Sequence, residues 1–371
     1  MFFPVSVNDS NGRVGIGSVV TKNAGEPLHL NHVNIAFFAI EKQGPNLSNR
    51  FRKSWYALRN TSFVEGFVDL GDYILPDEID EKHIDELGYA LSEIIDTGVP
   101  VVIFCAEPGI ANQVVQRAHG YLKTDYKALE INNRVAGSDT FGHTQSDDWL
   151  TKALQNDKSY LRQYGLLGYQ AFYMGDHQLD YLHKLGFESE RLGALKKSLI
   201  EAEPAIRATN YLHFNHEAIQ ASFTGNAHQY PNGFTGEEAC ALMRYGGASQ
   251  GLKVAIIESP ELGQHDVSAE LYAQMLWYFC EGVNLRYEEN PLQEDGNFTK
   301  YITSLDKPAD NIIFYKSQRT DRWWMYLPFD GDAYQDEQRL VPCSYADYER
   351  AVAGEIPNRW LFAINRLNGV D

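Results

Sequence analysis

Polar side chains follow several short apolar segments of this sequence, at points where a catalytic or binding site could form. Cys105 and Glu107 come at the end of one apolar run, and His213 and His216 come at the end of another. A thiol near a carboxylate and a histidine can act as a nucleophile when its pKa is lowered and a base is oriented toward it. Buried cysteines that serve as small apolar side chains are far more common, so a structural role is favoured for Cys105.

Further polar residues stand at the ends of apolar runs along the chain. Glu258 follows the run 252–257, and the string LHFNHEAI (212–219) places Asn215 and Glu217 beyond another run. A carboxylate in such a position can hold a cationic ligand by paired hydrogen bonds. It can equally cap local backbone or pair with an arginine, since a strand-end carboxylate need not be catalytic. Both interpretations of Glu258 stay open.

The elements that must position these residues follow from the pattern of apolar runs. Short β-rich runs alternate with helical periods, which is typical of a parallel sheet covered by helices on both faces. In such sheets ligands bind beyond the carboxyl ends of the strands. The predicted strands span 33–39, 66–70, 99–105, 127–131, 165–171, 207–214 and 252–257.

Two helices are indicated most clearly. Residues 79–97 place apolar side chains on one stripe and are followed by Gly98, a residue that commonly ends helices. Residues 268–281 are apolar nearly all round, which predicts a largely buried helix. Both helices are therefore expected to pack on the sheet.

The composition changes after about residue 290, where the strings NIIFYK and RWWMYLPF flank the turn-prone SQRTD. A hairpin and a short helix near 345–353 are predicted there, as an appendage packed on the main domain. The chain is thus divided into an α/β domain over 1–285 and a C-terminal extension over 286–371. Trp323 and its aromatic neighbours either form a recognition patch or cover part of a sheet.

The charge of the chain limits its partners. With 371 residues, 44% hydrophobic composition and a formal net charge of −18, the sequence is that of a globular protein with a sizeable core. Nucleic acid is disfavoured as a partner because its binding relies on clustered Lys and Arg.

No membrane insertion is expected, since no apolar stretch is long enough to cross a bilayer. The sequence starts without a signal-peptide pattern and its four cysteines are scattered, which favours a cytoplasmic protein with reduced thiols.

Several local strings resemble the arginase, agmatinase and formimidoylglutamase (ureohydrolase) family, over roughly residues 30–285. The resemblance implies a doubly wound, mostly parallel α/β sheet of about eight strands, and a homo-oligomer as in many relatives. It rests on the order and spacing of GPNLSNRFRKSWYAL (44–58), DLGDY (69–73), LLGYQAFY (166–173), NGFTGEEAC (232–240) and KVAIIESPELGQHD (253–266).

The family keeps its metal ligands at three strand ends, and this sequence departs from the pattern at all three. In place of Gly-Gly-x-His, Asp-x-His-x-Asp and Asp-x-Asp, it reads IFCAEPG, EINNRVAG and LHFNHEAI. Cys105 takes the place of a glycine, and Glu258 stands where the family holds the substrate's guanidinium group. The ligand positions are aligned with Glu107, Asn132, Arg134, Ala136, Asn215 and Glu217, although a shift of one or two residues would let Glu130 compete for one of them.

By resemblance, the family's reaction uses a hydroxide held between two Mn²⁺ ions to hydrolyse an amidine or guanidine. Here two Glu and one Arg give the aligned positions a net charge of only −1, and neither Ala nor a guanidinium can donate to a metal. We therefore predict that no metal is bound, with Mn²⁺ at low occupancy as the alternative. Arg134 is expected to replace the lost cations by pairing with Glu107 or Glu217, unless it is a surface residue.

Three functions are compatible with these residues. The favoured one is a pseudoenzyme that acts as a scaffold or binding partner, either for itself or for another protein. The alternatives are a ureohydrolase-like hydrolase of guanidino or formimino compounds, and a sensor that binds a small guanidinium ligand. A fold-level resemblance cannot decide among them, because function depends on the site.

Overall fold

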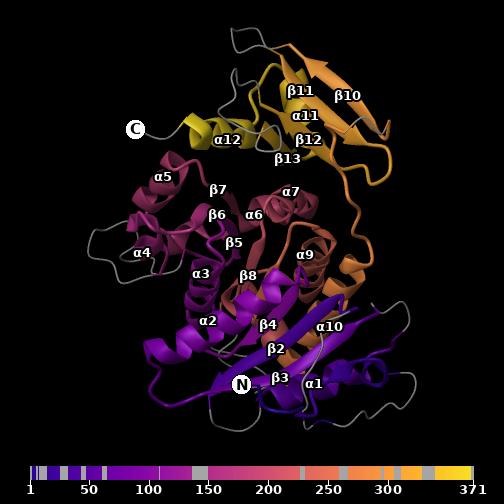
Figure 1. The fold of residues 1–371 in the computed structure, drawn as a ribbon. Coiled ribbons are helices and arrows are strands. Elements are labelled where there is room, and N and C mark those ends of the chain that lie inside the picture. The colour runs from indigo at the N-terminus through magenta and orange to yellow at the C-terminus, as the bar shows by residue number, and fades with distance from the viewer. Residues whose placement is uncertain are drawn as a thin grey trace.

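The computed structural model describes residues 2–368, apart from several short segments. Those segments are 6, 8–14, 26–31, 43–46, 61–64, 108, 136–148, 226–229, 259–265, 294–295, 305–310 and 328–338. The described chain forms an α/β domain and a smaller C-terminal unit, which Figure 1 shows at opposite ends of the view.

The α/β domain is built on a nine-stranded sheet in which every strand pair is parallel. The inner strands are apolar and buried on both faces, as parallel strands between two helical layers must be. In sheet order they are β1 (Thr21–Lys22), β3 (Phe67–Leu75), β2 (Ile35–Lys42), β4 (Val101–Cys105), β9 (Val254–Glu258), β8 (Tyr211–Asn215), β5 (Tyr126–Ile131), β6 (Leu161–Tyr169) and β7 (Glu188–Arg191).

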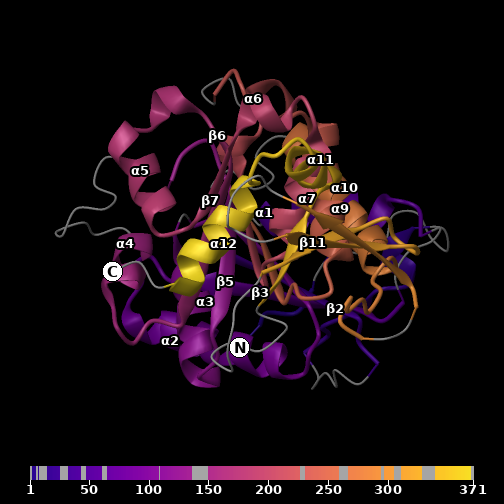
Figure 2. The same ribbon diagram turned by 90° about the horizontal axis from the view of Figure 1, so that it is seen from above.

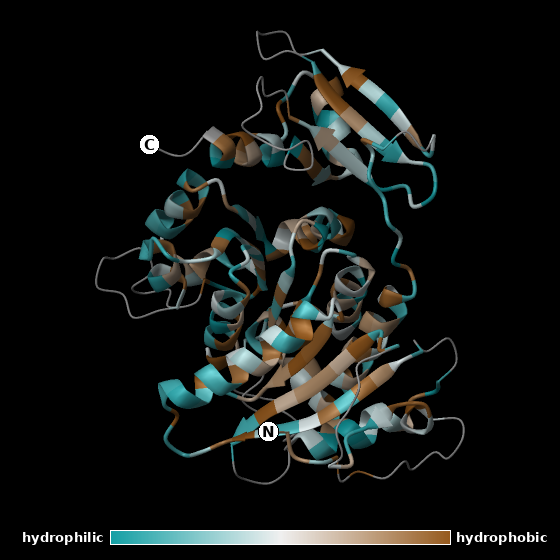
Figure 3. Ribbon diagram, viewed as in Figure 1, coloured by the Kyte–Doolittle hydropathy of each residue, from teal (hydrophilic) through white to brown (hydrophobic). Residues whose placement is uncertain are grey.

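Two separate apolar cores cover the two faces of this sheet, so the sheet is doubly wound. One core is formed with α1 (Leu47–Ala57), α7 (Ala202–Arg207), α9 (Gly236–Ala248) and α10 (Asp266–Val283). The other is formed with α2 (Glu81–Asp96), α3 (Ile110–Leu122), α4 (Trp149–Gln155) and α5 (Asp176–Lys184). Short helices α6 (Leu192–Leu195) and α8 (Ala221–Thr224) complete the domain, and Figure 3 shows apolar residues concentrated in the strands.

Helices α9 and α10 approach each other closely because both carry glycine at the contact. A Cβ atom on Gly247 would lie 2.0 Å from the backbone oxygen of Phe279, and one on Gly282 would lie 2.3 Å from that of Arg244. No side chain fits at either position without moving backbone. This contact buries one side of α10, while Val267, Glu270, Gln274 and Tyr278 form an exposed stripe, so the helix is less buried than its apolar sequence predicted.

The predicted strands are present, with two differences. The run 207–214 begins as the end of α7, so β8 starts only at Tyr211. The short strands β1 and β7 were not predicted, and they lie at the two edges of the sheet. The sheet therefore has nine strands rather than about eight.

The predicted C-terminal hairpin is the centre of a larger unit, which we call the C-terminal module (residues 298–368). Its four antiparallel strands are β10 (Phe298–Thr303), β11 (Ile312–Ser317), β12 (Trp323–Tyr326) and β13 (Leu340–Cys343), in that order. The predicted short helix is α11 (Tyr345–Val352), and a second helix, α12 (Asn358–Asn368), follows it. A third apolar core, which includes Phe314 and Trp360, holds the module together.

The C-terminal module packs at the amino ends of several strands of the α/β domain. A cavity there is lined both by Lys127 and Asn210, which lie at the starts of β5 and β8, and by Leu340 and Pro342 of the module. Helix α12 lies near β7 and α5 in Figures 1 and 2. The carboxyl ends of the strands are thus left clear of the module. Among the described residues, no helix is long and apolar enough to cross a membrane.

Candidate functional site

The candidate site lies at the carboxyl ends of four neighbouring strands. Glu258 ends β9 and is paired in register with Cys105 of β4 on one side and Asn215 of β8 on the other. His213 of β8 is paired in register with Glu130 of β5. Because side chains alternate along a strand, His213 and Asn215 project toward the same face of the sheet as Tyr211, which belongs to the core under α2 and α3.

Glu258 is a buried carboxylate with several donors around it. Its oxygens accept hydrogen bonds from the backbone N–H of Gly109 at 2.9 Å and from the Asn215 amide at 2.8 Å. Gly109 is the residue at the N-terminus of α3, where the helix dipole favours a negative charge. Burial opposes ionisation of Glu258, but the attraction of His213 and the Gly109 N–H outweigh it and lower its pKa.

His213 provides the cation that accompanies this carboxylate. Its Nε2 atom lies 3.5 Å from the Oε2 atom of Glu258, and both side chains are less than 5% exposed. Burial alone would favour the neutral imidazole, but attraction to Glu258 and Glu130 raises the pKa of His213 above its ordinary value. The two shifts favour an imidazolium next to a carboxylate, although neither ring nitrogen of His213 has a hydrogen-bond partner among the described residues.

Glu130 is the second buried carboxylate of the site. The Tyr164 hydroxyl donates to its Oε2 atom at 2.6 Å, and the Asn132 amide donates to its Oε1 atom at 2.8 Å. Burial raises the pKa of Glu130, against the opposing effect of nearby His213. Both oxygens of Glu130 are thus already used by hydrogen-bond donors of the protein.

Asn133 introduces a further polar group beside Asn132. Its side chain is fully buried, and neither its amide nitrogen nor its amide oxygen has a hydrogen-bond partner among the described residues. Buried amides in proteins are paired with protein, water or ligand. Asn133 therefore carries two buried polar atoms that a water molecule or a small ligand would have to satisfy.

Arg134 lies at the mouth of the site rather than inside it. Its guanidinium contacts the carboxylate of Glu217 at 3.3 Å and 3.4 Å, and its side chain is 36% exposed. It also lies 5.8 Å from the ring centre of Tyr230. The expected ion pair with Glu217 is present, but the buried cation of the site is His213.

Glu107 does not join the other aligned positions. Its carboxylate lies 2.8 Å from the ammonium group of Lys42, at the end of β2, so the alternative pairing of Arg134 with Glu107 was wrong. Alternation along a strand cannot predict where Glu107 points, because it lies two residues beyond the end of β4. Ala136 lies outside the described residues.

The environment of Cys105 is that of a structural thiol. The side chain is fully buried, and its Sγ atom donates to the backbone oxygen of Glu107 at 3.2 Å. Burial raises the pKa of this thiol, with the charge of Glu258 adding to the effect. Burial also lowers the pKa of His216 to about 4. A thiolate nucleophile is therefore strongly disfavoured here.

Those residues of the site that the structure describes do not fit a pair of divalent cations. Within the described ranges, no group of three or more His, Cys, Asp or Glu side chains could hold a metal ion. The carboxylate oxygens of Glu130 and Glu258 already accept from amides, a hydroxyl and a backbone N–H. Two of those donors belong to Asn132 and Asn215, at positions aligned with family carboxylates, and each directs its NH₂ group toward a neighbouring glutamate.

Two residues of the site, Glu130 and Asn133, are more central than their sequence context predicted. Glu130 was only a competitor for a ligand position, and Asn133 was not singled out. Both stand in or next to the apolar string ALEI of β5, where a charged or amide side chain must be buried with a partner. A polar residue inside a predicted buried strand is thus the signal that could have identified them.

Solved structures of arginase-superfamily enzymes share the fold of the α/β domain. The formimidoylglutamase of Bacillus subtilis aligns with a TM-score of 0.60 and 12% identity, over 76% of this chain and 96% of its own. A Mn²⁺-containing formiminoglutamase of Trypanosoma cruzi aligns with a TM-score of 0.59 and 12% identity, over 70% of this chain and 96% of its own. The agmatine ureohydrolase of Thermoplasma volcanium aligns with a TM-score of 0.54 and 14% identity, over 70% of this chain and 92% of its own.

By sequence alone, the chain matches no known family profile and no curated protein. Identities of 11–14% establish a common fold and leave the activity open. The chain therefore has the arginase-like α/β fold, with a sheet and helices that correspond to nearly the whole length of these enzymes.

Proposed function

We propose that this arginase-fold protein lacks the binuclear manganese centre and acts as a non-catalytic binding or scaffold protein. The observation that supports the proposal is the state of the two buried carboxylates. Glu130 and Glu258 are satisfied by donors of the protein and are accompanied by the cationic His213. His213 thus offsets part of the negative charge that metals would neutralise in the family.

Electrostatics favours this interpretation over a weak metal site. A divalent cation next to His213 would face a like charge in a medium where charges are poorly screened. To bind, it would also have to displace the Asn132 and Asn215 amides from their carboxylates, at the cost of buried hydrogen bonds. Each of these effects opposes occupancy by Mn²⁺.

Metal content and hydrolysis test the proposal together. The protein is expressed with Mn²⁺ in the medium, purified without chelator, and analysed for bound metal by elemental analysis. It is then assayed with formiminoglutamate, agmatine and arginine. We expect far less than one equivalent of Mn²⁺ and no hydrolysis. Two equivalents of metal, or turnover of any of these substrates, would favour the alternative, a ureohydrolase-like hydrolase.

A second candidate function is suggested by the ion pair at the mouth of the site. The Arg134 guanidinium rests on Glu217 as a guanidinium ligand would, but through long contacts of 3.3 Å and 3.4 Å. A small guanidinium compound could displace it, which would make the protein a sensor of such compounds. Burial raises the pKa of Glu217 and Arg134 opposes this effect, so a ligand cation would take over that opposing role once Arg134 left.

The sensor hypothesis is tested with the variant Arg134→Met, which removes the competing guanidinium. If the hypothesis holds, agmatine or arginine stabilises the folded state against heat, and more strongly in Arg134→Met than in the wild type. The double variant Arg134→Met/Glu217→Gln is the control, and it should lose the response. Equal responses in all three proteins would rule out Glu217 as the binding group.

A further inference from the structure

A large cavity lies far from the candidate site, between the α/β domain and the C-terminal module. Its volume is about 1280 Å³, which exceeds the range of about 300–1,000 Å³ usual for small-molecule pockets. One wall comes from residues 198–204, the end of α9 and Leu285. The other comes from β10–β12 and the start of α11. We call it the interdomain cleft.

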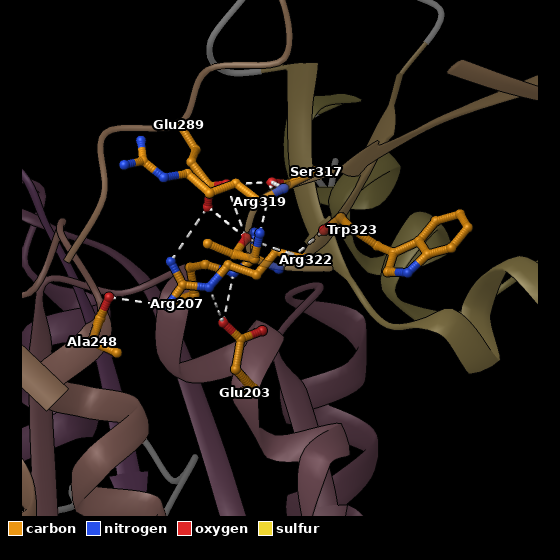
Figure 4. Close-up of polar contacts among 9 residues, drawn as sticks. Glu203, Arg207, Ala248, Glu289, Ser317, Arg319, Arg322 and Trp323 are labelled. Atoms are coloured by element: carbon orange, nitrogen blue, oxygen red, sulfur yellow. Dashed lines mark hydrogen bonds and ion pairs between the residues drawn. The ribbon is translucent and has the colours of Figure 1, made fainter. Parts of the chain in front are cut away.

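The walls of the interdomain cleft are held in place by a network of charged residues. Glu203 of α7 contacts Arg207 at 2.8 Å and Arg322 of the module at 3.1 Å. Arg322 also lies 3.6 Å from Glu289 and donates to the backbone oxygen of Ala248 at 3.0 Å. Figure 4 shows these side chains converging between the two units. The cleft is therefore preformed, so binding needs little reorganisation.

Large apolar side chains are exposed inside this cleft. Ile200 is 55% exposed and Leu285 36% exposed on the domain wall, and Tyr345 is 54% exposed on the module wall. Behind Tyr345, the rings of Tyr348 and Trp323 lie 5.0 Å apart and extend the aromatic surface. Exposed apolar side chains that gather in one concave surface mark a binding groove rather than ordinary surface.

The charges of the cleft point to the class of its ligand. Its lining contains four acidic residues, Glu201, Glu203, Asp321 and Glu349, and four basic ones, Arg244, Lys316, Arg319 and Arg322. Most of them are paired, as are Lys316 and Asp321 at 2.7 Å. A balanced lining in a protein of net charge −18 does not attract a polyanion. Tyr, Trp and Arg around apolar anchors are instead the residues that dominate binding to polypeptides.

One cation of the lining stands apart from these pairs. The guanidinium of Arg319 lies 4.0 Å from the ring centre of Tyr287 and has no carboxylate within salt-bridge distance among the described residues. Arg319 is thus available to a carboxylate or a carbonyl oxygen of a ligand. Glu349 is also exposed and has no ion-pair partner in the described part of the chain, so the cleft offers one group of each sign.

We propose that the interdomain cleft binds an extended peptide segment of a partner protein. Aromatic or aliphatic side chains of the segment would pack on Ile200 and Tyr345. Its polar groups would reach Arg319 and Glu349. The segment would be close to neutral, because the balanced lining of the cleft favours neither sign of charge. This binding surface is independent of the site at the carboxyl ends of the strands.

Selection from a phage-displayed library of random linear peptides tests this inference with the full chain. Enriched sequences are synthesised, and their binding to the wild type and to Ile200→Glu is measured by fluorescence anisotropy. Val352→Glu is the matched control, because Val352 is 61% exposed on α11 and does not line the cleft. Since both changes are at exposed positions, the variants should unfold at the temperature of the wild type.

We expect enriched peptides to contain aromatic or aliphatic anchors and to bind Ile200→Glu at least about tenfold more weakly, as the loss of one anchoring contact implies. The same peptides should bind Val352→Glu as tightly as the wild type. The inference is overturned if no peptide is enriched, or if binding to Ile200→Glu is undiminished. The inference is also overturned if single-stranded nucleic acid or an oligosaccharide binds the wild type and Val352→Glu but not Ile200→Glu, because the cleft would then belong to another class of ligand.

Discussion

The Nε2 atom of His213 lies 3.5 Å from the Oε2 atom of Glu258, across the boundary between strands β8 and β9. Each side chain would be costly to bury alone, because an isolated charge in the interior loses its hydration. Their proximity favours a charged pair between the strands at the centre of the sheet. The stability of the folded site should therefore depend on both residues.

Glu258→Gln should therefore destabilise the protein strongly. It removes the closest counter-charge of His213, which can then lose its proton, and it leaves buried donors short of an acceptor, at a cost of about 1–3 kcal/mol. Glu217→Gln is the matched control, because it breaks the half-exposed pair with Arg134, which is worth about 0–1 kcal/mol. The free energy of unfolding in urea measures both. Similar losses in the two variants would contradict the assignment of His213 as a buried cation.

His119 of α3 should make stability depend on pH. It is buried, its Nδ1 atom lies 3.0 Å from the backbone oxygen of Thr124, and its ring stacks on Tyr126. Burial lowers its pKa, with weaker opposing effects from Thr124 and Asp125. Below the unfolded-state pKa of about 6.5, the unfolded chain binds the proton more readily than the folded one, so stability falls as pH decreases.

The measurement is urea unfolding of the wild type and His119→Gln between pH 7.5 and pH 5, values chosen to bracket the ordinary histidine pKa of about 6.5. The wild type should lose stability more steeply over this range. Above the unfolded-state pKa, the free energy of unfolding should change with pH equally in the two proteins. Parallel profiles throughout would show that His119 does not contribute.

Substitution of Gly247 should disrupt the contact of α9 with α10. Its new Cβ atom would lie 2.0 Å from the backbone oxygen of Phe279, so one helix must move. We expect Gly247→Ala to cost about 1–3 kcal/mol or more, as in other overpacked cores. The control is Gly120→Ala in α3, where a Cβ would meet nothing within 4 Å. Gly120→Ala should stabilise the protein by about 0.4–1 kcal/mol, because alanine reduces the conformational entropy of the unfolded chain. Thermal unfolding of both variants measures the two effects.

Arg359 should be essential for docking the C-terminal module. It is buried and contacts Asp347 at 2.6 Å, Glu188 at 2.8 Å and Glu201 at 3.4 Å. Arg359→Met leaves these carboxylates without a cation, so a loss of about 3–5 kcal/mol is expected. Arg350→Met, at an exposed position of α11, should change stability by less than about 0.5 kcal/mol. Under limited proteolysis, the C-terminal module should be cleaved from Arg359→Met earlier than from Arg350→Met or the wild type.

The central strands were predictable because they are buried on both faces and read as continuous apolar runs. The missed strands are those at edges. β7 (ESER) pairs only with β6, and β13 (LVPC) pairs only with β12 and contains Pro342. Edge strands tolerate charge and proline because one side of their backbone needs no partner. Their sequences therefore carry little signal of a strand.

The site was predictable to the extent that it depends on strand ends. Asn215 and Glu258 each end a predicted strand and so lie at the same edge of the sheet, while only the structure shows that their strands are neighbours. The partners of Glu107 and Arg134 depend on loop geometry, which no periodicity encodes. Lys42 in particular lies at the end of a different strand, and only the three-dimensional arrangement brings it to Glu107.

The contact between Glu188 and Arg359 spans 171 residues of sequence, and this has a consequence for biosynthesis. A ribosome delivers the whole sheet, including β7, well before Arg359 emerges. Until then the carboxylate of Glu188, which is buried in the finished protein, lacks its partner. Domains generally begin to fold during synthesis. This step of folding must therefore await Arg359, so truncation before that residue would leave an otherwise complete sheet with an uncompensated charge.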